Sequence, residues 1–198
     1  MKLVETRNGW MLEDILEDMD FNKTQIRFKN MAGRQTNPKY NPAHVFVVWI
    51  DDDELVNFLK NELHLNVQDR EVDVKDENGD VTGVKVRHSL QFKAYPKMRF
   101  NRINGKEEPS PRIMLKTTST GASARLGIKN FGQFDATRLI SADLKFHVWE
   151  YDQGCFLPVI DEIWAVVDES AGEVDDSYLA EKYGYSEDDA PVDWGVED

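Results

Sequence analysis

The sequence predicts a mostly β protein of the α+β class, built as an OB-like small β-barrel with one or two short helices. Three observations favour this class. Several segments alternate apolar and polar residues, which is the pattern of half-buried strands. Turn residues separate these segments, and Asn78-Gly79 is a strong hairpin signal. Many short strands with few helices are typical of small barrels.

The N-terminal segment, residues 1–22, is predicted to be an acidic arm or a short helix. Apolar residues recur there at helical spacing, at Met11, Leu12, Ile15 and Leu16. A nucleic-acid-binding domain is expected over residues 23–168. It begins with a strand at 24–31, in which Ile26 and Phe28 alternate with cations.

A loop up to Pro42 follows, and an apolar strand is expected at 44–50. The acidic run 51–54 stands directly before apolar residues at helical spacing. Carboxylates in this position accept hydrogen bonds from free amides and complement the helix dipole. We therefore predict that the run caps a helix and does not bind a metal ion.

The rest of the domain is predicted to be strands joined by turns. They are expected at 65–74, 81–95, 112–117, 142–151 and 156–167, with an irregular segment at 118–138.

Charge is strongly segregated along the chain. The formal net charge is -13, yet residues 21–50 hold five bases and no acid, and residues 83–148 hold thirteen bases and four acids. The local field, more than the total charge, decides whether a surface binds a polyanion. The basic segments indicate a nucleic-acid-binding surface, although cations that merely solvate a sheet would look the same.

Cations and aromatic residues share faces of the predicted strands, because side chains two apart point the same way. Cations can hold the phosphates of a single strand, and exposed rings can stack on unpaired bases. The predicted cations are Arg27, Lys29, Arg34, Lys39, Lys93, Lys97, Arg99, Arg102, Arg112, Lys116 and Lys145, and Arg87 shares the basic face of its strand. The predicted stacking rings are Tyr40, Tyr95, Phe100, Trp149 and Tyr151, with a core position as the alternative for Trp149.

Signatures of catalysis are missing from the sequence. It has no phosphate-binding Gly-Lys-Ser/Thr loop, its histidines are scattered, and Cys155 is its single cysteine. We expect no enzyme activity, cofactor, metal site or membrane span, and a reducing cytoplasmic location. Two alternatives stay open. One is a metal-dependent nuclease using Asp161, Glu162 or the acids at 51–54, and the other is a protein-interaction module whose acidic surface mimics DNA.

Several motifs resemble a family of bacteriophage proteins. They are the strand and turn from Ile26 to Arg34, the loop Tyr40-Asn41-Pro42, the segment from Phe46 to Asp52, and the last hairpin with Trp149-Glu150, the turn Gln153-Gly154 and the strand from Ile163 to Val167. Members of that family look like OB-fold single-stranded-DNA-binding proteins. The resemblance implies binding of single-stranded DNA during phage replication, recombination or repair, in the cytoplasm of the infected host cell.

Residues 169–198 are predicted to be an acidic, disordered C-terminal tail. Trp194 and Val196 are apolar residues among its acids, and we expect them to dock replication or recombination proteins. The sequence leaves a homo-oligomer open.

Truncation after Tyr185 is predicted to tighten binding of single-stranded DNA. A tethered acidic tail is at high effective concentration beside a basic surface and competes with phosphate for its cations. The gain should be largest at low salt, where screening is weakest. Fluorescence anisotropy with oligo-dT measures it, and unchanged affinity at low salt would show that the tail does not occupy the surface.

Overall fold

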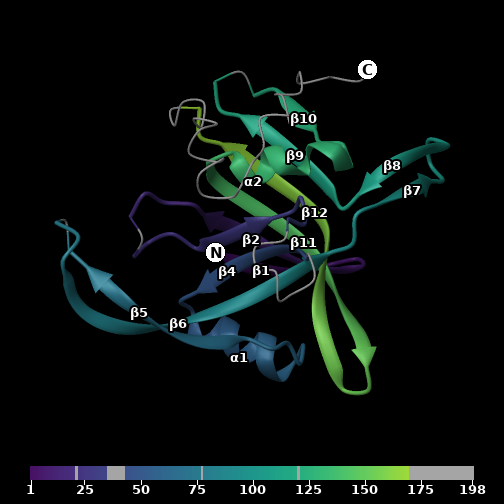
Figure 1. Ribbon diagram of the computed structural model, residues 1–198. Coiled ribbons are helices and arrows are strands. Elements are labelled where there is room, and N and C mark those ends of the chain that lie inside the picture. The colour runs from purple at the N-terminus through teal and green to yellow at the C-terminus, as the bar shows by residue number, and fades with distance from the viewer. Residues whose placement is uncertain (21, 35–42, 77, 120, 170–198) are drawn as a thin grey trace.

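Strands make up most of the protein, as the sequence predicted. The computed structural model describes residues 1–20, 22–34, 43–76, 78–119 and 121–169. Within these ranges ten strands join one sheet, and two more form a separate hairpin (Figure 1). The tail residues Trp194 and Val196 lie outside the described residues.

The main sheet has the strand order β1-β2-β11-β12-β6-β4-β3, while β5 pairs with β6, and β9 pairs with β10 and β12. Its strands are β1 (Lys2–Thr6), β2 (Gly9–Leu16), β3 (Ile26–Asn30), β4 (His44–Ile50), β5 (Gln68–Lys75), β6 (Val81–Ala94), β9 (Arg112–Thr117), β10 (Ser123–Arg125), β11 (Leu139–Asp152) and β12 (Cys155–Val167). The separate hairpin is β7 (Lys97–Asn101) with β8 (Lys106–Ser110). Across the described residues the sheet does not close into a barrel, so the OB-like barrel is not confirmed.

In the described ranges two short α-helices accompany the sheet, α1 (Asp53–Asn61) and α2 (Phe131–Ala136), the second preceded by a 3-10 turn at Ile128–Asn130. None of the helices in the described part of the chain is long and apolar enough to cross a membrane.

One hydrophobic core holds the sheet and α2 together. Phe46 of β4, Phe92 of β6, Phe134 of α2 and Phe146 of β11 are fully buried. The rings of Phe92 and Phe146 meet edge to face at 5.1 Å, and those of Phe46 and Phe134 lie 6.0 Å apart. Burying each ring stabilises the fold by about 1.5–3 kcal/mol.

The helix considered for residues 10–20 is wrong, because Gly9–Leu16 is strand β2. A β-bulge explains the misleading spacing. Leu12 pairs with Leu144 and Ile15 pairs with Ala142, so two residues of β2 stand opposite one of β11. Asp14, at φ 56°, is part of this bulge, and its N–H donates to Asp143 Oδ1 at 2.9 Å. Leu12 and Ile15, three positions apart, therefore both reach the core.

The acidic run before α1 acts as the predicted helix cap. The Asp52 side chain accepts hydrogen bonds from the N–H groups of Glu54 and Leu55, at 3.0 and 3.1 Å. Asp53 and Glu54 occupy the first turn, where their charges complement the dipole.

Arg87 is fully buried, so its predicted place on an exposed basic face is wrong. Its guanidinium lies 4.2 Å from the centre of the Trp49 ring. It donates to both carboxylate oxygens of Asp51, at 2.8 and 2.7 Å, and to the carbonyl of Thr24 at 2.8 Å. The part of β6 before Arg87 does not bury an apolar face either, because Val84 and Val86 are more than half exposed.

Residues 97–102 lie outside the strands that the sequence predicted, yet they form β7 and the start of the turn that follows it. Strand β8 was not predicted either. A two-stranded ribbon has little buried surface, so it leaves no clear apolar face in the sequence.

Asp51→Asn is predicted to lower the free energy of unfolding by about 2 kcal/mol, because it removes the carboxylate that accepts two hydrogen bonds from the buried Arg87 guanidinium. Its neighbour provides the control. Asp52→Ala removes only the helix cap, which costs about 1 kcal/mol. Urea denaturation of both variants measures the two free energies of unfolding. A smaller loss at Asp51 than at Asp52 would contradict a stabilising role of the ion pair between Asp51 and Arg87.

Candidate nucleic-acid interface

A groove opens where β12 separates from β6. These parallel strands share a single paired position, Val159 with Lys93. Pro158, directly before it, has no N–H to donate to a neighbouring strand. The end of the β11–β12 hairpin therefore projects from the body of the sheet (Figure 1). Trp149, Tyr151 and Phe156 of this hairpin form one wall of the groove.

The groove has a volume of about 760 Å³, within the range of ligand-binding pockets. Its cations are Arg27, Arg70 and Lys93. The other lining residues are Phe28, Val47, Asn66, Gln68, Ser89, Leu90, Gln91, Tyr95, Trp149, Tyr151, Phe156, Leu157 and Pro158. No carboxylate is among the described residues that line it, although the chain carries a net charge of -13. The charged side chains that line the groove are therefore all positive.

Three aromatic rings at the groove are about half exposed. The exposed fractions are 47% for Tyr95, 46% for Trp149 and 55% for Tyr151. Tyr95 and Trp149 meet edge to face, with ring centres 5.8 Å apart. The neighbouring Cys155 raises the pKa of the Tyr151 hydroxyl. A tyrosine is neutral at pH 7 even without this shift, so the ring does not repel an anion. These rings offer planar apolar surface beside the cations.

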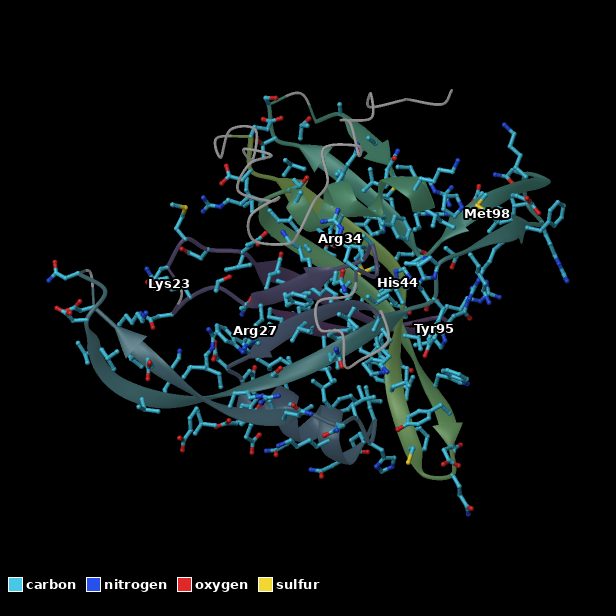
Figure 2. The ribbon with its side chains drawn as sticks, viewed as in Figure 1. Lys23, Arg27, Arg34, His44, Tyr95 and Met98 are labelled. Atoms are coloured by element: carbon cyan, nitrogen blue, oxygen red, sulfur yellow. The ribbon has the colours of Figure 1, made fainter. Side chains whose placement is uncertain are left out.

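Two of the three cations in the groove contact uncharged neighbours. Arg27 lies 5.2 Å from the centre of the Trp49 ring, and Arg70 donates to Gln68 Oε1 at 2.6 Å. Among the described residues, neither arginine nor Lys93 forms an ion pair with a carboxylate. Their charges are therefore available to an anionic ligand. Figure 2 labels Arg27 and Tyr95.

A second cavity, of about 490 Å³, lies at the foot of the β7–β8 hairpin. It contains four of the predicted DNA contacts, Arg99, Phe100, Arg112 and Lys145. Acids accompany these cations. Lys145 lies 3.3 Å from Glu162, and Arg112 lies 3.6 Å from Glu108 and 3.8 Å from Glu162. Among the described residues, four bases and three acids therefore line this cavity, whereas three bases and no acid line the groove.

Glu108 keeps its charge in the second cavity. Hydrogen bonds from Asn104 and Asn101, with a smaller contribution from Arg125, lower the pKa of its carboxyl to about 2. His147 Nδ1 lies 2.8 Å from Asp161 Oδ2 in the same cavity. Glu162, considered for a nuclease, also accepts a hydrogen bond from the indole N–H of Trp164.

The remaining predicted cations are dispersed. Lys29 is buried, with 7% of its side chain exposed, and its ammonium is 2.7 Å from Glu17, so it does not face a ligand. Burial lowers its pKa, and Glu17 opposes this shift. Arg34 is half-buried, Lys116 is exposed on β9, and Lys97 and Arg102 are exposed on the β7–β8 hairpin. Lys39 and Tyr40 lie outside the described residues.

The structure therefore brings together five predicted residues: Arg27, Lys93, Tyr95, Trp149 and Tyr151. Sequence reasoning missed Arg70 and Phe156. Arg70 stands in an acidic segment, so the segregation of charge did not point to it. Phe156 belongs to a strand with many core residues, so its sequence position did not distinguish it from them. Only the pairing of distant strands reveals that they share one groove.

Within the described ranges, no three His, Cys, Asp or Glu side chains gather as metal ligands would. No protein-family model, curated protein or solved structure matches the chain.

Lys93→Met and Lys29→Met are predicted to have different effects on DNA binding, because Lys93 lines the groove and Lys29 is buried. If Lys93 neutralises one phosphate, its loss reduces the magnitude of the slope of log affinity against log salt by about 0.7 for a single strand. Lys29→Met should leave the slope unchanged, because Lys29 is buried beside Glu17. Anisotropy titrations with oligo-dT measure both slopes, and equal reductions would refute the assignment of the groove.

Proposed function

We propose that the protein binds single-stranded DNA in the groove between β6 and the β11–β12 hairpin, without regard to base sequence and without catalysis. One observation carries the proposal. In an acidic chain, this groove combines three cations with three half-exposed rings, and no carboxylate lines it among the described residues.

The chemistry of the groove matches a single strand. Arg27, Arg70 and Lys93 would hold phosphates, while Tyr95, Trp149 and Tyr151 would stack on bases. Every base has a π-face, so stacking tolerates any sequence. A duplex keeps its bases paired and stacked, and would leave these rings unused. Preference for single strands follows from this difference.

The biological setting belongs to the same proposal. The sequence motifs that resemble phage OB-fold proteins support a role in phage DNA replication, recombination or repair. An OB-like architecture is likewise part of the proposal, with β11, β12, β6 and β4 as the strands around the groove.

A salt-titrated comparison of oligo-dT with a duplex of equal length tests the proposal. Log affinity for oligo-dT should fall linearly with log salt, by about 0.7 for each phosphate neutralised, and the duplex should bind more weakly. A salt-independent affinity, or equal affinity for the duplex, would refute single-strand binding.

Trp149→Ala provides the matching test of stacking. Loss of the ring should weaken binding of oligo-dT by about 1–3 kcal/mol. Trp164→Ala is the control, because Trp164 lies on the same hairpin with a similar exposed fraction, 42% against 46%, but does not line the groove. Equal losses in both variants would show that Trp149 has no special contact with bases.

A further inference from the structure

Two hairpins project from opposite sides of the molecule, β5–β6 on one side and β7–β8 on the other (Figure 1). Among the described residues, β5 pairs with β6 alone and β7 pairs with β8 alone. Each strand therefore has one edge whose backbone groups pair with no other strand of this part of the chain. Such an edge is a template for another strand.

The two edge strands have complementary alternation. In β5, Glu71 and Asp73 alternate with Val72 and Val74, while β7 reads Lys97-Met98-Arg99-Phe100. Because the side-chain period of a strand is two, each strand has one charged face and one apolar face. The charged faces have opposite signs.

The charged side chains of both edges are exposed. Glu71, Asp73, Lys97 and Arg99 form no ion pair with other described residues. Met98 and Phe100 are 50% and 64% exposed, and Figure 2 shows Met98 on the projecting hairpin. Both faces of β7 are therefore open to a partner.

We propose that β7 of one copy of this chain adds to the free edge of β5 in a second copy. In one register, Glu71 and Asp73 face Lys97 and Arg99 on one side of the joined sheet, and the valines face Met98 and Phe100 on the other. Opposite charges and apolar pairs stabilise neighbouring strands. A shift by one residue sets valines against cations, so the pattern disfavours that register.

The contact uses different surfaces of the two copies. After β7 of one copy has paired, its own β5 remains free to accept the next copy, so the assembly is head to tail and open-ended. A closed two-fold dimer would instead require the same surface on both copies.

The contact would also bring the grooves of neighbouring copies close together. Arg70 directly precedes Glu71, and Tyr95 stands two residues before Lys97; both line the groove. If the proposed function holds, one DNA strand could then pass from copy to copy. The association itself requires no DNA and does not depend on that function.

Sedimentation velocity of the DNA-free full chain tests the association. The sedimentation coefficient should rise with protein concentration past the value of a dimer, and the rise should weaken with added salt. A monomer at every concentration, or a dimer that does not grow, would overturn the proposal.

Two charge-reversed variants test the surfaces. Glu71→Lys with Asp73→Lys, and Lys97→Glu with Arg99→Glu, should each remain monomeric, because each sets like charges opposite one another. Their mixture should regain the concentration-dependent rise, since each variant complements the other. Glu54→Lys on α1 with Glu62→Lys at its C-cap makes the same change in net charge as the first variant and should associate like the wild type. Wild-type behaviour of either edge variant, or a mixture that stays monomeric, would contradict the pairing.

Disulfide trapping gives a second measurement with smaller substitutions. In a Cys155→Ser background, Asp73→Cys and Arg99→Cys proteins should form a disulfide-linked heterodimer when mixed and oxidised, and neither should cross-link alone. Absence of the heterodimer would overturn the contact. Because no DNA is present, failure here would leave the groove proposal intact, and an array that assembles but ignores DNA would overturn only the proposed function.

Discussion

The arrangement of the protein depends on strand β12 changing its partner at Val159. Before this residue β12 pairs with β11 and, at Phe156, forms an isolated bridge with Leu65. At Val159 it meets β6 once, and from Glu162 it also runs beside β9. The hairpin end is thereby separated from β6, and its aromatic residues remain half exposed at the groove. The same strand buries Ile160 and Ile163 in the core, so one strand both stabilises the fold and forms the site.

Acids and bases are distributed unevenly between the two cavities. At the foot of the β7–β8 hairpin, Glu108 and Glu162 accompany the cations, and the pKa of Glu108 is held at about 2. In the groove, Arg27 and Arg70 contact a ring and an amide. An unpaired cation keeps its attraction for phosphate, whereas a cation already beside a carboxylate offers little net field. The groove is therefore the better of the two cavities for an anionic ligand.

Alternation and turn signals predicted β3, β4, α1, β9, β11 and β12 near their observed bounds, because those elements bury one face. They also predicted β5 and β6, whose hairpin is marked by the Asn78-Gly79 turn although β5 buries no residue. Prediction failed where a local feature interrupted the two-residue period of a strand. The bulge at Asp14 produced the apolar spacing of a helix, and Arg87 is buried because it contacts Trp49 and Asp51. The segment from Asn30 to Gly33, one of the motifs that resemble the phage family, has structural roles. The Asn30 side-chain amide donates to the carbonyls of Arg34 and Ala43, and Gly33, at φ 69°, lies directly against the His44 ring. Five predicted contacts do meet in the groove, but no pattern in one strand could reveal which cations had acidic partners elsewhere.

Photo-cross-linking to an oligo-dT that carries iododeoxyuridine tests the central claim most directly. This probe reacts with aromatic side chains that stack on the substituted base, and peptide mapping identifies them. The account predicts adducts at Tyr95, Trp149 and Tyr151, suppressed by unlabelled oligo-dT and not by duplex. Adducts confined to Phe100 and the second cavity, or no adduct that single strands suppress, would contradict the groove as the binding site.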